Sequence, residues 1–115
     1  MYYTGYTITK LEPAHYIISD AQVYLSAKKT VNLTLVQYPY SGQSGTAHLF
    51  YKLIKQESGT DTSELGVKDN LVDHNVTISF SNVAAGWYKI QISNYSRDNG
   101  PTAAGNGYTN DGNQQ

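Results

Sequence analysis

The residues in this chain best suited to contact a ligand are aromatic. The sequence holds 11 Tyr and one Trp, and strand alternation or loop position places several of them away from a core. Such rings combine apolar contact area with a polar tip, and on a rigid sheet they stack on sugar rings or on a protein partner. We predict that four of them bind the ligand: Tyr38, Tyr40, Trp87 and Tyr95.

Within this aromatic set, Trp87 has two interpretations. The second face of a two-layer sheet can also pack, in which case Trp87 belongs to the core rather than to a contact surface. Tyr38 and Tyr40 flank Pro39 in a predicted loop, which favours the surface. The wider set of aromatic candidates also includes Tyr2, Tyr3 and Tyr6.

Acidic and amide side chains could supply oxygen ligands to calcium in two short segments. Asp69 and Asp73 enclose the first segment, and Asp98 and Asn99 form the second. Neither segment matches the twelve-residue EF-hand loop, and Asx residues in turns usually bond to their own backbone. Calcium at Asp69 and Asp73 is therefore a candidate, and no other cofactor is predicted.

Residues that could support catalysis do not form a known pattern. His15, His48 and His74 do not have the spacing of a zinc motif, and zero Cys removes thiolate ligands and nucleophiles. The turn at residues 41–45 contains Ser44 but not a Gly-x-Ser-x-Gly nucleophile elbow. We therefore expect a protein that is not an enzyme.

The elements that would position these residues have the two-residue period of β-strands. The clearest segment is 30–38, in which Val31, Leu33 and Leu35 share one face. Residues 47–55 carry apolar side chains on both faces, which is typical of a central strand. The other predicted strands are residues 3–9, 16–18, 22–26, 75–81 and 87–93.

Short strands separated by turn signals predict an all-β fold. We expect a single-domain, jelly-roll-like β-sandwich of about seven or eight antiparallel strands, with a barrel as the second choice. The last two predicted strands should form a hairpin around residues 84–86. The sandwich should cover residues 1–96, and residues 97–115 should be a Gly- and Asn-rich tail that is partly mobile.

Charge and hydropathy limit the partners. A formal net charge of −1 and the absence of a basic cluster argue against nucleic acid and against an anionic membrane surface. No apolar run is long enough to span a bilayer, so membrane insertion is not expected. The first residues do not resemble a signal peptide, which leaves a cytoplasmic or phage product, or a secreted domain without its leader. We favour the secreted domain.

Residues 75–94, NVTISFSNVAAGWYKIQISN, resemble the closing hairpin of bacterial pre-peptidase C-terminal domains. In that family an alternating strand leads into an Ala-Gly-aromatic-Tyr turn and a final strand. Residues 30–35 and 47–53 resemble the preceding strands of the family, although 47–53 lacks its acidic residues. The resemblance implies a secreted jelly-roll-like accessory domain, sometimes using calcium, that helps an associated enzyme hold its substrate.

These observations lead us to expect a non-catalytic extracellular module that contacts polysaccharide, cell wall or a protein surface through exposed Tyr residues. A second hypothesis is a structural or assembly protein, such as a phage virion, coat or matrix component, with Tyr-rich edges mediating assembly. A small secreted toxin or inhibitor comes third. The sequence leaves the oligomeric state open.

Overall fold

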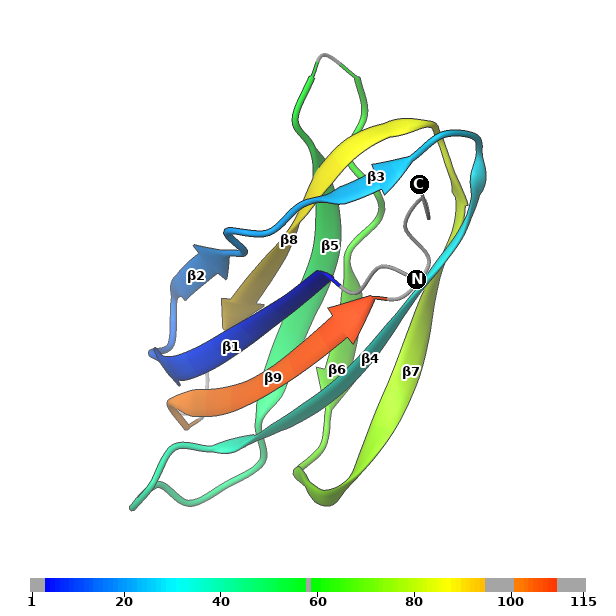
Figure 1. Cartoon of the computed structure of the whole chain (residues 1–115). Helices are drawn as coiled ribbons and strands as arrows, with labels where there is room; N and C mark the ends of the chain where they lie inside the picture. Colours follow the sequence, from blue (N-terminus) through cyan, green and yellow to red (C-terminus); the bar gives the residue numbers. More distant parts are fainter. Residues whose placement is uncertain (1–3, 58, 95–100, 110–115) are drawn as a thin grey trace.

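The computed structural model describes residues 4–57, 59–94 and 101–109. Within these ranges the chain folds into nine β-strands and no helix. The strands form two antiparallel sheets that pack face to face as one sandwich (Figure 1). The expected all-β, single-domain sandwich is confirmed.

The first sheet has four strands, and its last strand in sequence lies between two much earlier ones. Figure 1 shows β9 between β1 and β4, with β7 at the far edge. Tyr108 of β9 pairs with Gly5 on one side and with Thr34 on the other. The strands in spatial order are β1 (Thr4–Leu11), β9 (Ala103–Thr109), β4 (Lys29–Pro39) and β7 (Leu71–Val83).

The second sheet has five strands, two of which share one side of the long strand β8. Tyr24 of β3 pairs with Trp87 of β8, and Tyr16 of β2 pairs with Ser93 farther along the same strand. Both short strands therefore form one interrupted edge. The strands are β2 (His15–Ile18), β3 (Val23–Leu25), β8 (Gly86–Asn94), β5 (His48–Lys55) and β6 (Leu65–Lys68).

This strand order is a jelly roll. When β2 and β3 are counted as one interrupted strand, eight strands wind between the two sheets, as jelly rolls do. Among the connections, only that from β5 to β6 joins neighbouring strands of one sheet as a simple hairpin. The jelly-roll expectation is confirmed.

The core lies between the sheets and follows from the alternation of the strands. Val31, Leu33 and Leu35 of β4 are buried, and they face Ile90 and Ile92 of β8 across the interior. Their outward neighbours are polar or half-buried, as a two-layer β fold requires. The predicted inward faces of these two strands are confirmed.

Two expectations about the connections are wrong. The predicted hairpin of the strands around Val76 and Ile90 does not form, because β7 pairs with β4 in the first sheet and β8 pairs with β5 in the second. The 97–115 segment is not a tail throughout, because Ala103–Thr109 forms the buried strand β9. Residues 97–100 and 110–115 lie outside the described residues.

Candidate functional site

An aromatic pair, of which Trp87 is exposed and Tyr24 half-buried, occupies one end of the outer face of the second sheet. Tyr24 and Trp87 are directly opposite each other on β3 and β8, and their ring centroids are 4.7 Å apart at a tilt of 40°. The indole of Trp87 points away from the core because its neighbour Tyr88 points inward, and Trp87 is 43% exposed. The pair forms a platform that solvent reaches directly.

The opposite end of this face carries a second aromatic group. Tyr16 of β2 is 61% exposed, and Phe50 of β5 is half-buried on the far side of Ser93. Phe50 lies over Gly66 of β6, where an added Cβ would come within 2.8 Å of its ring. A glycine at this position therefore allows the ring to lie flat on the sheet. His48 continues the cluster, with its ring centroid 4.6 Å from that of Phe50.

Polar side chains lie between the two aromatic ends. Lys89 and Gln91 of β8 point outward beside Ile54 and Lys52 of β5. The Lys52 Nζ lies 3.8 Å from the Asp61 carboxylate, and this partly exposed ion pair adds little to stability. The surface thus offers hydrogen-bonding groups in the middle and rings at both ends.

We call this surface the aromatic face. Trp87 and Ser93 are six positions apart along β8, which is roughly 20 Å at the usual strand rise. An elongated ligand is needed to contact both ends. The aromatic and apolar side chains of the face are Tyr16, Ile18, Tyr24, Phe50, Ile54 and Trp87.

The predicted ligand-binding residues do not form one surface. Trp87 lies on the aromatic face, and its interpretation as a core residue is wrong. Tyr38 of β4 points outward from the first sheet, on the opposite side of the sandwich. Tyr40 follows it in the next loop, with Lys10 Nζ 5.4 Å from its ring centroid. Tyr95 lies outside the described residues.

The other N-terminal aromatic candidates do not add to a surface. Tyr6 points into the interior and packs 6.3 Å from Tyr51, so its interpretation as a contact residue is wrong. Tyr2 and Tyr3 lie outside the described residues. Sequence reasoning missed Tyr24 and Tyr16. Alternation in their short strands already points both side chains outward, because their neighbours Val23 and Ile17 point inward.

The outer face of the first sheet is mainly hydroxyl-rich. The hydroxyls of Thr34 and Thr77 are 2.9 Å apart across β4 and β7, and Ser79 donates a 2.6 Å hydrogen bond to Asn32 Oδ1. These contacts link neighbouring strands, so the polar side chains are hydrogen-bonded to one another within the sheet. Among the described residues, two aromatic residues lie on this face, Tyr108, which is 39% exposed, and the half-buried Tyr38.

The two predicted calcium ligands lie in different elements and accept different hydrogen bonds. The carboxylate of Asp69 accepts a 2.8 Å hydrogen bond from the backbone N–H of Asn70, as Asx residues in turns often do. Asp73 lies on β7, where a hydrogen bond from His74 lowers the pKa of its carboxyl below the usual value. The described residues contain no group of three or more His, Asp or Glu side chains placed to hold a metal ion. Calcium at Asp69 and Asp73 stays a prediction.

The three histidines have separate surroundings. The His15 ring contacts the carbonyl of Pro13 at 2.9 Å, His48 stacks beside Phe50, and His74 contacts Asp73. They lie on β2, β5 and β7.

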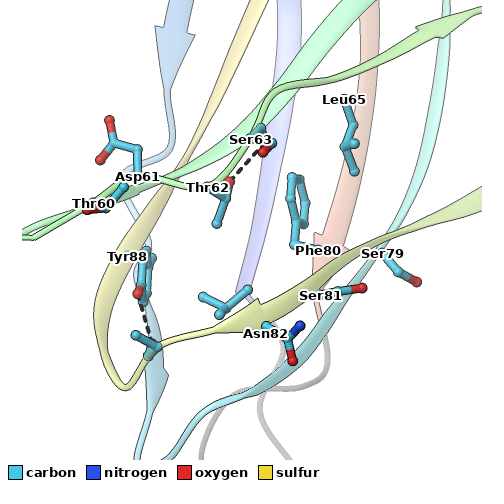
Figure 2. Close-up of a pocket in the computed structure, with 12 residues that line it drawn as sticks. Thr60, Asp61, Thr62, Ser63, Leu65, Ser79, Phe80, Ser81, Asn82 and Tyr88 are labelled. Carbon is cyan, nitrogen blue, oxygen red and sulfur yellow. Dashed lines mark hydrogen bonds between the residues drawn. The ribbon is translucent and has the colours of Figure 1, made fainter.

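A groove of about 490 Å³ opens between β7 and the segment before β6. Figure 2 shows Phe80 and Leu65 pointing into this edge groove, whereas Ser79 and Ser81 point away from it. Tyr88 lies farther along and donates a hydrogen bond to the carbonyl of Ala84. One wall of the groove is therefore the backbone of β7, and its floor is apolar.

The rim of the edge groove has one carboxylate among its lining residues. Asp61 Oδ1 accepts a 2.9 Å hydrogen bond from the backbone N–H of Lys55, and Oδ2 faces Lys52. The Thr62 hydroxyl bonds to the backbone of Leu53. These polar groups hold the loop against β5, so their role is structural.

No protein-family model matches the sequence, and no curated protein is significantly similar to it. In the part of the chain that the structure describes, no helix has the length and apolar character required to cross a membrane.

Proposed function

We propose that this protein is a non-catalytic, secreted module that binds polysaccharide on its aromatic face. The observation that carries the proposal is the pairing of the exposed Trp87 with the half-buried Tyr24 on two neighbouring strands. Soluble proteins seldom leave large rings grouped at a sheet surface unless a ligand or partner covers them. A jelly roll holds the two rings rigidly, so little conformational entropy is lost on binding.

The pattern of groups favours a carbohydrate. Sugar rings have apolar faces that stack on aromatic rings, and hydroxyl groups at their edges that need hydrogen-bond partners. The aromatic face offers rings at both ends and Gln91, Lys52 and Lys89 between them. A purely apolar protein partner would leave these polar groups unpaired, which costs binding energy.

The experiment uses Trp87 as its own reporter, because it is the only Trp of the chain. Titration with soluble neutral and acidic polysaccharides should change its fluorescence, and calorimetry should give the affinity. Trp87→Ala and Tyr24→Ala should each weaken binding by about tenfold, as expected for loss of one stacking ring.

Two control variants test the position of the site. Tyr108→Ala removes an exposed ring from the opposite sheet, and the double variant Tyr38→Ala with Tyr40→Ala removes the pair first predicted from sequence. Both should bind like the parent protein. Equal binding by Trp87→Ala, or no binding to any polysaccharide of the panel, rejects the proposal.

A further inference from the structure

The edges of the two sheets differ in how they are protected. Exposed sheet edges pair with other chains unless they are short, charged or bulged. β2, β3 and β6 have only four, three and four residues. β1 carries Lys10 and a register shift between Ile8 and Leu11. β7, in contrast, has 13 residues.

The backbone of β7 has a partner on one side only. Within the described ranges it pairs with β4 and with no other strand. In an antiparallel ladder, alternate residues point their N–H and C=O groups to the other side, which here faces the edge groove. From Asn75 to Val83 the sequence contains no Pro, Lys, Arg, Asp or Glu. From Val76 to Phe80, between the two register shifts of β7, the usual deterrents to strand pairing are therefore missing.

Apolar side chains remain partly uncovered along the same edge. Val76 and Ile78 point toward the interior and pack against the core, but they are only half-buried. Leu65 is also half-buried on the opposite side of the groove. A strand added beside β7 would cover these side chains and satisfy the free backbone groups at once.

We propose that β7 pairs antiparallel with β7 of a second copy of this chain, about a two-fold axis at Ile78. Ile78 then lies opposite the partner's Ile78, Thr77 opposite the partner's Ser79, and Val76 opposite the partner's Phe80. The inward side chains of both copies stay on the inner face. The two first sheets become one continuous sheet of eight strands.

The register follows from the shape of β7. Residues 76–80 pair regularly with β4, whereas register shifts lie on both sides of them. Ile78 is the middle of this regular segment, so centring on it gives the longest unbroken ladder. A shift of one residue would set inward residues against outward ones and misalign the two faces. Asp73 and His74 fall outside the paired segment, so no like charges face each other.

The symmetry of this contact closes the assembly. The same segment is used by both copies, so the pairing is isologous and forms a dimer rather than a fibre. The other edge of the first sheet, β1, is protected by Lys10 and its bulge. The aromatic face belongs to the second sheet and stays exposed in the dimer, so polysaccharide binding and dimer formation can be tested separately.

Sedimentation and light scattering across protein concentrations test the dimer. The monomer mass is 12.7 kDa, and the measured mass should rise toward twice this value with concentration. Thr77→Lys with Ser79→Lys places lysines opposite each other in the pair and should raise the dimer dissociation constant by about tenfold or more. The matched control is Thr7→Lys with Thr9→Lys on the outer surface of β1, which should dimerise like the parent.

Charge exchange makes the test specific. A chain with Thr77→Asp and Ser79→Asp should also be monomeric alone, and mixing it with the lysine variant should restore a dimer. A parent protein that stays monomeric at every concentration overturns the proposal. So does a lysine variant that folds normally and dimerises as well as the parent.

The lack of native Cys allows the register to be measured directly. Under mild oxidation, Ile78→Cys should form a disulfide-linked dimer, because Cα atoms opposite each other in a ladder lie at disulfide distance. Val76→Cys should remain largely unlinked, since it faces the partner's Phe80. Preferential linking through Val76→Cys would overturn the proposed register.

Discussion

The hydroxyl of Tyr51 donates a 2.7 Å hydrogen bond to Oε1 of Gln37 in the interior of the sandwich. Tyr51 lies on β5 and Gln37 on β4, so the bond joins the two sheets. The Gln37 Nε2 also lies 3.1, 2.8 and 3.2 Å from the carbonyl oxygens of Ala47, Val67 and Asp69, which share its two hydrogens. One polar side chain thus satisfies several buried groups at the end of the sandwich near β6.

Replacement of Gln37 should therefore destabilise the fold strongly. Gln37→Leu keeps a similar volume but leaves the Tyr51 hydroxyl and several backbone carbonyls without this partner. Buried polar groups left unpaired cost about 1–3 kcal/mol each, and we expect a total loss of about 3 kcal/mol or more. Urea denaturation measures the loss. Gln43→Ala, in an exposed turn, is the control and should change stability little.

The neighbouring tyrosines should respond differently to loss of the hydroxyl. Tyr51→Phe leaves Gln37 Oε1 without its donor and should cost about 1–2 kcal/mol. The buried Tyr6 hydroxyl lies beside Tyr51 without a hydrogen bond of normal geometry among the described residues, so Tyr6→Phe should cost less than Tyr51→Phe. Thermal and urea unfolding of the two variants measure this contrast. Equal destabilisation by both would contradict the arrangement of the core.

These phenols should also make the fold sensitive to alkali. Burial raises the pKa of Tyr6 and of Tyr51 well above the usual value. In the unfolded chain both ionise near pH 10, whereas in the folded chain they remain protonated to higher pH. Their contribution is thus complete below about pH 10 and is lost as pH rises toward the folded-state pKa values.

Stability measured against pH tests this behaviour. The free energy of unfolding should fall steadily above about pH 10, because unfolding then releases protons from Tyr6 and Tyr51. The double variant Tyr6→Phe with Tyr51→Phe should show a smaller fall over the same pH interval. An unchanged slope would show that other groups cause the alkaline transition.

Gly105 should tolerate no side chain. It lies in β9 opposite Gln37 of β4, and an added Cβ would collide with the backbone carbonyl of Val36 and come within 2.9 Å of the Gln37 Cα. Backbone cannot move aside cheaply in the middle of a sheet, so Gly105→Ala should cost at least about 2 kcal/mol. Gly5→Ala on β1 is the control, because its added Cβ would meet its nearest atom at an ordinary 3.4 Å.

A chain shortened to end at residue 102 should not fold. Without β9, β1 loses its only strand partner in the described structure, and one side of β4 is opened. Circular dichroism and amide dispersion in NMR measure the loss. A synthetic peptide of residues 101–109 added to the shortened chain should restore the sheet. A shortened chain that folds without the peptide would contradict the central role of β9.

The fold was predictable where strands are long and alternate cleanly. Val31, Leu33 and Leu35 already define the inner face of β4, and the same rhythm defines β8 around Ile90. The pairing of strands was not predictable, because period two says which face is buried but not which neighbour is adjacent. The segments around β7 and β8 therefore looked like a hairpin, although they lie in different sheets.

β9 was missed for a physical reason. Its composition of Ala, Gly and Asn is typical of a flexible tail, but small residues are needed where it lies. The Tyr6 ring fills the space beside Gly107, where an added Cβ would lie 2.7 Å from its Cζ. Tyr6 therefore supplies the apolar contact that a larger side chain of β9 would otherwise make. β6 was missed because four residues including Gly66 carry too little pattern.

The candidate site was predicted only in part. Trp87 was found because it is the one Trp and because the alternate residues of its strand point inward. Tyr24 was missed because β3 has only three residues. Tyr38 was assigned to the same surface as Trp87, although it lies on the other sheet. Assigning residues to a common surface requires the strand order, which a single sequence does not contain.

The position of β9 also sets an order for assembly on the ribosome. β4 and β7 can meet as soon as both have emerged, and β5 can join β8 soon afterwards. Among the described strands, β1 is synthesised first and has no strand partner until β9 arrives, since β9 separates it from β4. During translation the nascent polypeptide should therefore have an incomplete first sheet and an unpaired β1. Only the insertion of β9 completes the sandwich.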